Sequence, residues 1–343
     1  MSEFDFVDHY EDQEESANLL PENEAESAIN CAFVGIGGGG CKIAKAFLDL
    51  GFTKTLLINT TDKDFQAGID QDHLLALPGA DGVAKNIELG RKVLNENSAL
   101  VEDALRTRLG KVDWLFVCAG GGGGTGSSAA ILDPVFKRFL EINEASGKVV
   151  YVVTSPTSQE KLNATIKSNA KSLESDVSTN PHIVLDNERQ LNAFRGKVGV
   201  LGLYPAANKA FAKMFWQLLR LACEQSPIQA FDGKDLERFL SAPGRMVLGS
   251  AIVQPSTNLG VELYQSCINN SPCPKPTGHA ETGVLLQVIT EDHANDVDIS
   301  GHLEAATAYV GGRTNTLFSG IYVRDALPGL VSVMALAGLP CEN

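Results

Sequence analysis

From residue 30 onwards the chain repeats one pattern: a short apolar run, then glycines or polar residues, then a segment of helical periodicity. The apolar runs lie at 31–34, 55–58, 112–119, 149–153 and 182–185, and helical spacing is found at 42–50, 86–107 and 127–144. Strands that are apolar throughout and alternate with helices predict an α/β fold with a parallel sheet covered on both faces. A ligand is then expected at the carboxyl ends of the strands.

A long helical pattern over 205–225 separates this region from a second one. Its apolar positions leave little polar face, which predicts a helix buried on most sides. The later apolar runs, at 284–289, 316–323 and 330–336, alternate more strongly and predict a smaller α+β domain, while 262–282 predicts a loop. The predicted organisation is therefore an arm (1–29), a parallel-sheet domain (30–204), a central helix (205–225) and a C-terminal α+β domain (226–343).

Charge is concentrated at the N-terminus. The 343 residues include 42 acidic and 28 basic ones, for a net charge of −14, and ten of the acidic residues but none of the basic ones lie within the first 29. Such a composition predicts a disordered acidic arm, which serves either as a solubilising tail or as a regulatory arm anchored by Phe4, Phe6 and Tyr10. An acidic chain has no general electrostatic hold on nucleic acid or anionic membranes, so a link to DNA would require a partner protein.

The sequence predicts a cytoplasmic protein. No apolar run reaches the roughly 20 residues that cross a bilayer, and the N-terminus lacks the basic start and apolar stretch of a secretory signal. The seven cysteines are odd in number and stand mostly in apolar context, which fits a reducing compartment. Cys267 and Cys273 lie six residues apart without a CxxC motif, so we expect no zinc site there.

Two glycine clusters follow predicted strands and precede predicted helices. They lie at 35–40 and 120–126, and glycines without Cβ let backbone amides approach phosphate oxygens closely. The first cluster alone is also compatible with a dinucleotide-binding turn, and the chain contains no Walker motif. The second cluster lies between a very apolar segment and an apolar helix, which excludes a flexible linker.

The sequence from Gly122 to Ser127, Gly-Gly-Gly-Thr-Gly-Ser, resembles the signature loop of the tubulin/FtsZ superfamily. Further segments resemble the other loops of that family in the same order: 59–62, 82–90, 156–160 and the start of the central helix. The resemblance implies a GTP-binding domain joined by a central helix to a smaller α+β domain, with GTP or GDP and Mg²⁺ bound. It implies nucleotide contacts at Gly38, Gly39, Gly40, Cys41, Asn59, Lys85, Asn86, Gly122, Gly123, Gly124, Thr125, Gly126, Ser127, Glu160, Asn187, Tyr204 and Asn208.

Tyr204 and Asn208 lie one helical turn apart, on one face of the predicted central helix. The resemblance implies that Tyr204 stacks on the guanine and that Asn208 reads its Watson–Crick edge. Taken by itself, Tyr204 is also compatible with a half-buried core aromatic, which is the less favoured interpretation.

The segment 231–244 resembles the loop with which one subunit of this family completes the active site of the next. Its acids are Asp232 and Asp235, and the resemblance implies a GTPase that forms a head-to-tail homopolymer. A helix of about 20 residues spans roughly 30 Å, so these acids would act on the neighbour's nucleotide rather than on their own. Their alternative role is to cap the helix that begins beside them.

The patterns around Cys41, 82–90 and 231–244 are most similar to the TubZ-like plasmid and phage branch. This implies filaments that position or segregate DNA through a DNA-binding adaptor. Three positions depart from the family pattern: Ser127–Ser128 in place of a glycine, Ala164 in place of a basic residue and Ala230 in place of an asparagine. These departures keep a non-hydrolysing filament open as an alternative, beside an FtsZ-like cell-division scaffold.

An NAD-type oxidoreductase is the alternative from another class of protein. It would use the glycines at 35–40 as a dinucleotide turn and an acidic residue at the end of the second strand to bind the ribose. Asn59 and Thr60 stand at that point, and the second glycine cluster would have no role. The chain's six histidines also offer no convincing catalytic pair, so this alternative is the weaker one.

Overall fold

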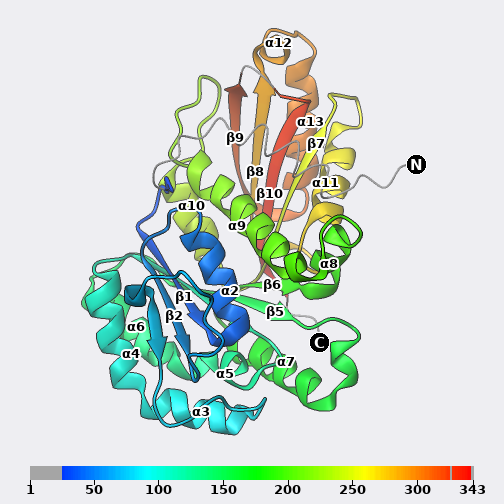
Figure 1. The fold of residues 1–343 in the computed structure, drawn as a ribbon. Coiled ribbons are helices and arrows are strands. Elements are labelled where there is room, and N and C mark those ends of the chain that lie inside the picture. The colour runs from blue at the N-terminus through cyan, green and yellow to red at the C-terminus, as the bar shows by residue number, and fades with distance from the viewer. Residues whose placement is uncertain (1–24, 325–326, 341–343) are drawn as a thin grey trace. The chain divides into compact units, whose positions relative to one another are not determined.

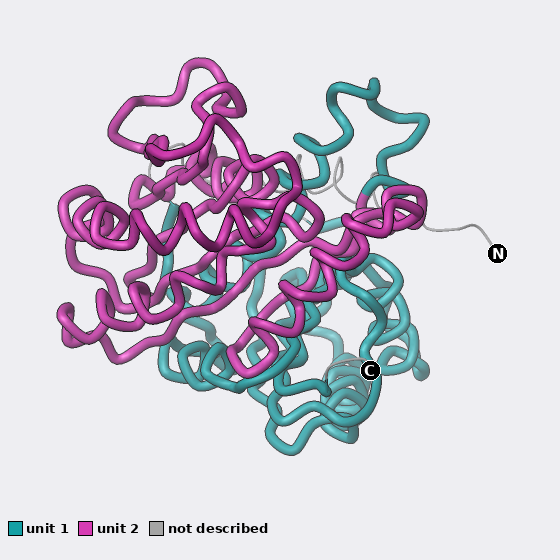
Figure 2. The backbone as a smooth tube through the Cα atoms, turned by 90° about the horizontal axis from the view of Figure 1, so that it is seen from below, with its two compact units in different colours: residues 1–28, 191–343 teal, residues 29–190 magenta. Residues whose placement is uncertain are grey.

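A computed structural model describes residues 25–324 and 327–340. The predicted arm, with Phe4, Phe6 and Tyr10, therefore lies mostly outside the described residues. The chain divides into two compact units, shown in Figure 2: unit 2 comprises residues 29–190, and unit 1 comprises residues 191–343 together with 1–28. Among the described residues, no helix is long and apolar enough to cross a bilayer.

Unit 2 contains the predicted parallel sheet (Figure 1). Its strands lie in the order β3-β2-β1-β4-β5-β6, and every neighbouring pair is parallel. The strands are β1 (Cys31–Ile36), β2 (Thr55–Asn59), β3 (Leu74–Ala76), β4 (Trp114–Gly120), β5 (Val149–Ser155) and β6 (Pro181–Asp186). The α/β prediction is confirmed.

The helices of unit 2 follow the strands along the chain. They are α2 (Gly37–Leu48), α3 (Ile87–Glu96), α4 (Ser98–Ala104), α5 (Gly124–Ser127), α6 (Asp133–Ile142) and α7 (Ala164–Val177), and α8 (Asn187–Phe194) begins at its end. The helix expected over 127–144 is interrupted, because Pro134 cannot donate a backbone hydrogen bond and stands in the first turn of α6. A short 3₁₀ segment, Ala129–Leu132, fills the interval.

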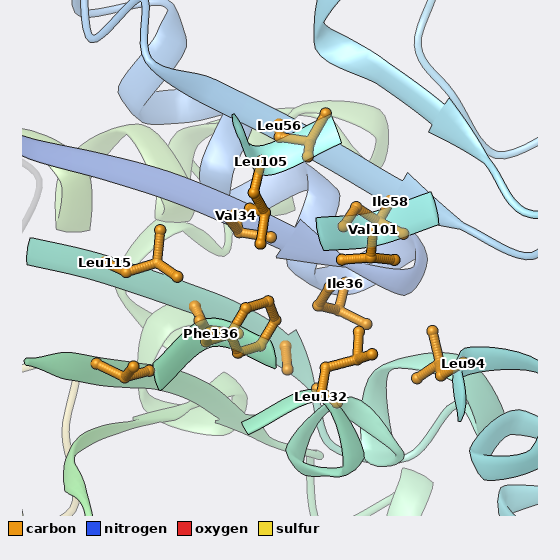
Figure 3. Packing of buried hydrophobic residues seen from close by; sticks show 14 of the residues in the cluster. Val34, Ile36, Leu56, Ile58, Leu94, Val101, Leu105, Leu115, Leu132 and Phe136 are labelled. Atoms are coloured by element: carbon orange, nitrogen blue, oxygen red, sulfur yellow. The ribbon is translucent and has the colours of Figure 1, made fainter. Parts of the chain in front are cut away.

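Strand β1 shows why its apolar run has no polar face. Val34 and Ile36 belong to the core cluster formed with Val101 and Phe136 from α4 and α6, as Figure 3 shows. Phe33, which points to the opposite side, stacks on Phe47 of α2 at 3.9 Å between ring centroids. Burial on both faces therefore accounts for the unbroken apolar sequence.

Unit 1 contains the central helix and, after it, four strands that lie in the order β7-β10-β8-β9. Strand β10 is antiparallel to β7 and β8, and β8 is parallel to β9. The elements are α9 (Leu203–Leu221), α10 (Gly233–Leu240), β7 (Gly244–Val253), α11 (Leu259–Asn270), β8 (Ala280–Thr290), α12 (Glu291–Ala294), α13 (Ile299–Gly311), β9 (Thr314–Arg324) and β10 (Leu330–Leu339).

The loop expected over 262–282 is wrong in its first part, because α11 continues to Asn270. Leu259, Leu263 and Cys267 recur every four residues, and all three are fully buried. This helical spacing explains the element. The Cys, Pro and Asn content of the segment obscured it.

Candidate functional site

The strand order of unit 2 reverses direction between β1 and β4, and the two glycine clusters follow these strands. In parallel sheets such a switch point forms a crevice at the carboxyl ends of the strands. A cavity of about 370 Å³ lies there. It is lined by Gly38, Gly39, Asn59, Thr60, Thr61, Asp64, Gly82, Val83, Ala84, Lys85, Gly120 to Gly126, Thr154, Pro156, Glu160, Ile166 and Asn187.

The first glycine loop opens helix α2 against the second loop. Gly37 has a φ of +70°, and a Cβ there would lie 2.7 Å from the backbone nitrogen of Gly126. No side chain caps the N-terminus of α2. Because the first amides of a helix have no partner within it, those of Gly38 and Gly39 are directed to the cavity they line.

The second glycine loop is packed against the segment 82–86. A Cβ on Gly124 would lie 2.4 Å from Cγ2 of Val83 and 2.9 Å from the carbonyl oxygen of Asn86. Gly123, by contrast, has open space where its Cβ would stand. The loop thus has one face in contact with protein and one face toward the cavity.

Asn169 of α7 joins the two segments. Its side chain is 4% exposed, and its Nδ2 donates to the carbonyl oxygens of Lys85 at 2.8 Å and Gly122 at 3.4 Å. Ala84 and Lys85 both have positive φ, at 46° and 65°. Non-glycine residues in this region cost about 1–3 kcal/mol each, so the surrounding contacts must hold them in place. No pattern in the sequence pointed to Asn169.

The loop after β2 supplies oxygen atoms to the cavity. Asn59 donates from Nδ2 to Oδ2 of Asp64 at 3.1 Å, and the hydroxyls of Thr60 and Thr125 lie 2.8 Å apart. The Asp64 carboxylate stands 3.2 Å from the position that a Cβ on Gly38 would take. Sequence reasoning missed Asp64, because it lies five residues beyond the strand in a loop without a periodic pattern.

Four predicted site residues of unit 2 do not line the cavity. Gly40 and Cys41 lie further along α2, where backbone amides are bonded within the helix. The Cys41 thiol donates to the carbonyl oxygen of Ile58 at 3.5 Å, and burial raises its pKa far above the usual value, so it stays protonated. Asn86 instead caps α3, since its Oδ1 accepts from the amide of Leu89 at 3.0 Å.

Ser127, the fourth of these residues, braces the glycine loop from behind. Its Oγ accepts from the backbone amide of Gly122 at 2.9 Å. The hydroxyl oxygen of the neighbouring Ser128 lies 2.8 Å from the carbonyl oxygen of Gly124 and 2.9 Å from that of Ile87, and its one hydrogen is shared between these two acceptors. The pair that departs from the family glycine pattern therefore makes internal bonds that preserve the loop.

Glu160 and Asn187 both line the cavity, as the other predicted contacts of unit 2 do, whereas Tyr204 and Asn208 of unit 1 are not among the lining residues. Glu160 accepts from the backbone amide of Thr157 at 2.8 Å through Oε2, which fixes the turn after β5. Asn187 is the first residue of α8.

No protein-family model matches this chain. Several solved structures share its fold along nearly the whole chain. A GTPγS-form protofilament of TubZ from Bacillus thuringiensis serovar israelensis has a TM-score of 0.76 at 18% identity, covering 93% of this chain and 89% of that one. A GTPγS-bound protofilament of CetZ2 from Haloferax volcanii has a TM-score of 0.72 at 20% identity, covering 91% and 93%. An empty FtsZ dimer from M. jannaschii has a TM-score of 0.65 at 20% identity, covering 95% and 91%.

The chain has the tubulin/FtsZ fold. The cavity lies among the loops that the resemblance of the sequence assigned to a nucleotide. The predicted site residues that have not yet been described are Tyr204, Asn208, Asp232 and Asp235, and all four belong to unit 1.

Tyr204 and Asn208 lie in the first two turns of α9, with Tyr204 37% exposed and Asn208 7% exposed. Helix α9 has 19 residues, which corresponds to about 28 Å. Asp232 and Asp235 stand beyond its other end. There Asp232 caps α10 and accepts from the amides of Lys234 at 2.7 Å and Asp235 at 3.0 Å.

The two acids thus cap helix α10, which is the alternative role that the sequence allowed for them. The two roles are compatible, because Oδ1 of Asp232 makes both of these capping bonds, and its second oxygen makes neither of them.

Tyr322 of β9 fixes the segment that carries these acids. Its buried hydroxyl donates to the carbonyl oxygen of Leu221 at 2.8 Å and accepts from the amide of Phe231 at 3.1 Å. The phenol therefore joins the end of α9 to the residue before Asp232.

Replacing Tyr322 by Phe is expected to lower the free energy of unfolding by about 1–2 kcal/mol, because two buried backbone groups lose their partner. Chemical denaturation measures this, and amide hydrogen exchange should quicken over 229–235. Tyr309→Phe is the matched control, since its ring packs on Arg313, away from this segment. Equal stability and exchange in the two variants would show that Tyr322 does not hold the loop.

Gly124→Ala is expected to displace the segment 82–86 and to lower stability by about 1–3 kcal/mol through overpacking. Gly123→Ala is the control next to it, because its new methyl group meets no protein atom within 4 Å. Thermal unfolding of the two variants measures the difference. A Gly124→Ala protein as stable as Gly123→Ala would contradict the packing of the second loop described above.

Proposed function

We propose that this chain is a filament-forming GTPase that binds GTP, assembles head to tail and hydrolyses GTP to GDP and phosphate at the contacts between subunits. The observation that carries the proposal is the pair of glycine loops that converge on one cavity at the switch point of the sheet. Solved structures with the same fold include protofilaments of TubZ and CetZ2 with GTPγS and a GDP-bound CetZ1 monomer.

The triphosphate is assigned to the backbone amides that line the cavity. Amides of Gly38 and Gly39 come from the start of α2, and those of 123–126 come from the second loop, whereas the amides of Gly121 and Gly122 donate to Thr154 and Ser127. Such groups bind anions without side-chain reorganisation, and the positive end of a helix dipole adds to the attraction. Glu160 and Asn187 are assigned to the ribose and base side of the nucleotide, and Tyr204 and Asn208 to stacking on and reading of the guanine.

The oxygen-rich side of the cavity fits Mg²⁺. A carboxylate this close to phosphate-binding amides would repel a triphosphate unless a cation lay between them. Asp64, with the Asn59 amide oxygen and the Thr60 and Thr125 hydroxyls, offers the hard oxygen ligands that Mg²⁺ takes alongside phosphates. When bound, the cation would neutralise charge on the phosphates. Asp64, Asn59 and the two threonines would hold it.

Asp232 and Asp235 are assigned to the neighbouring subunit's nucleotide. Their backbone bonds fix both carboxylates in direction, which suits groups that orient and polarise an attacking water. Hydrolysis of a phosphoanhydride needs little more than positioning and charge stabilisation. Because a head-to-tail contact does not close on itself, repeating it produces a filament.

The similarity to the TubZ branch favours DNA positioning as the cellular task, and an FtsZ-like scaffold is the alternative. The TubZ protofilament has the TM-score of 0.76, against 0.65 for the FtsZ dimer. Because the net charge is −14, we assign the contact with DNA to a DNA-binding adaptor protein rather than to this chain. One argument for a non-hydrolysing filament is weakened, because Ser127 and Ser128 support the loop through their own hydrogen bonds.

Asn208→Ala is expected to weaken GTP binding about tenfold or more and to relax discrimination against ATP. A lost hydrogen-bonding side chain at a buried site costs on the order of 1–3 kcal/mol. Titration of both nucleotides into wild type and variant measures this. Unchanged selectivity for GTP over ATP would remove Asn208 from the base site.

Asp235→Ala is expected to bind GTP as the wild type does and to assemble, but to hydrolyse GTP at least about a hundredfold more slowly, because the acid acts only at an assembled contact. Light scattering and negative-stain imaging with GTP, GDP and a slowly hydrolysed analogue follow assembly, and phosphate release follows hydrolysis. Glu237→Ala, which removes an ion pair with Lys234 on the same helix, is the control.

Mixing the two proteins separates action within a chain from action on a neighbour. GTP held by an Asp235→Ala subunit should be hydrolysed when a wild-type loop docks on it. Wild-type turnover by the variant alone, or hydrolysis that is independent of protein concentration below the assembly threshold, would overturn the assignment.

A further inference from the structure

Asn169 is a polar residue on the buried, otherwise apolar face of α7. The residues that share this face, Ala170, Leu173 and Val177, are all buried, and Leu173 and Val177 belong to the core cluster of unit 2. Asn169 is buried with them and is not among the residues that line the cavity. A buried amide costs free energy unless it is hydrogen-bonded, so packing alone does not account for a polar side chain here.

The amide group of Asn169 bonds to one carbonyl oxygen in each of two cavity segments. Its Nδ2 donates to Lys85 at 2.8 Å and, more weakly, to Gly122 at 3.4 Å, and an amide has one hydrogen for each of them. Because Asn169 lies outside the cavity, both carbonyl oxygens are directed into the protein. Turned toward the cavity, these partly negative atoms would repel phosphate oxygens.

The bond to Gly122 decides where the next backbone amide points. In a planar trans peptide the carbonyl oxygen and the following N–H point in opposite directions. With the oxygen of Gly122 held by Asn169, the amide of Gly123 is therefore directed to the other side. That side is the cavity, because Gly123 lines it and no protein atom lies within 4 Å of the position that its Cβ would take.

The bond to Lys85 fixes the backbone at the one basic residue among the described residues that line the cavity. The other charged residues of the lining are acids. The peptide that follows Lys85 is held on both sides, since its oxygen accepts from Asn169 and the amide of Asn86 donates to the carbonyl oxygen of Val83 at 2.8 Å. These two bonds hold the left-handed φ of 65° and keep the exposed Lys85 at the cavity.

We propose that Asn169 is a positioning residue for the phosphate groups of the nucleotide. It holds the backbone so that the Gly123 amide and the Lys85 ammonium group meet the phosphates, and it touches no phosphate itself. The inference rests on the proposed function, in which the cavity binds GTP, and it adds the residue that keeps two of the cation and amide donors in place. Donors that are already in place bind an anion without a cost of reorganisation.

Asn169→Ala and Asn169→Leu test this on the full chain. Alanine removes the donor, and leucine removes it while keeping about the same side-chain volume, so that no cavity is left in the core. With Mg²⁺ present, both variants are expected to bind GTP and inorganic tripolyphosphate about tenfold or more weakly than the wild type does. Isothermal titration calorimetry measures both ligands.

Asn97→Ala is the matched control. The Nδ2 of Asn97 also donates to two backbone carbonyl oxygens, those of Pro78 at 3.0 Å and Val93 at 2.8 Å, and none of these three residues lines the cavity. Both alanine variants are expected to be less stable than the wild type in chemical denaturation, but only Asn169→Ala should lose affinity for the two ligands. Equal affinities in the two variants would reduce Asn169 to a structural role and refute the inference.

Lys85→Gln tests the same arrangement at an exposed position, where the fold does not depend on the side chain. It is expected to bind tripolyphosphate about threefold or more weakly, because one positive charge is lost. Added to Asn169→Ala, the same change should have a smaller effect, since the lysine is then already displaced. If Lys85→Gln binds tripolyphosphate as the wild type does, or if its effect is the same with and without Asn169, Asn169 does not act through Lys85.

The remaining outcomes distinguish this inference from the proposed function. If the wild type binds GTP and both Asn169 variants bind it equally well, the inference fails and GTP binding stands. If the wild type binds tripolyphosphate but not GTP, and Asn169→Ala weakens that binding, the inference is supported and the assignment to GTP fails. If the wild type binds neither ligand, the inference and the proposed function fail together.

Discussion

The structure of the site depends on backbone-to-backbone contact between the two glycine loops. Because β1 and β4 are neighbouring parallel strands, the chain leaves both at the same edge of the sheet, and the loops that follow must pass within contact distance. A Cβ on Gly40 would stand 2.1 Å from the carbonyl oxygen of Cys118, and one on Gly37 would meet the amide of Gly126. Any side chain at these points would force the strands or the loops apart. The cavity, the start of α2 and the position of the segment 82–86 all follow from this absence of side chains.

The parts of the site that the sequence predicted are those that follow directly from a strand. Gly38 and Asn59 come immediately after apolar runs, and parallel strands bring their carboxyl ends together whatever the rest of the chain does. Asp64 and Asn169 were missed, because a loop of irregular length and one face of a helix decide where they point. Gly40 and Cys41 were predicted as nucleotide contacts but do not line the cavity, because a motif does not reveal at which residue the backbone amides of a helix become engaged. That boundary is set by the start of α2, which only the structure locates.

The acids beyond α9 illustrate how a structural role can prepare a chemical one. A helix cap fixes the direction of a carboxylate as firmly as a buried side chain would, and it does so at an exposed position. The hydroxyl of Tyr322 then fixes the residue before the cap. In the proposed function these acids orient water at a contact between two subunits, and such a group has to be exposed before assembly and still hold its direction. The capping box satisfies both requirements.

Ser127 has a physical consequence for the second glycine loop. Its hydroxyl accepts the amide hydrogen of Gly122, a bond that a residue without a side-chain oxygen could not make. One backbone donor is therefore engaged within the protein and is withdrawn from the set that faces the cavity. In return, the strongly extended turn at Gly122, with a φ of +142°, is fixed from within the loop. Since an amide that is already in place loses little entropy when an anion arrives, the remaining donors bind in a preorganised arrangement. The Ser127 hydroxyl thus removes the Gly122 amide from the donors that face the cavity. In return, it fixes the shape of the loop from within the protein.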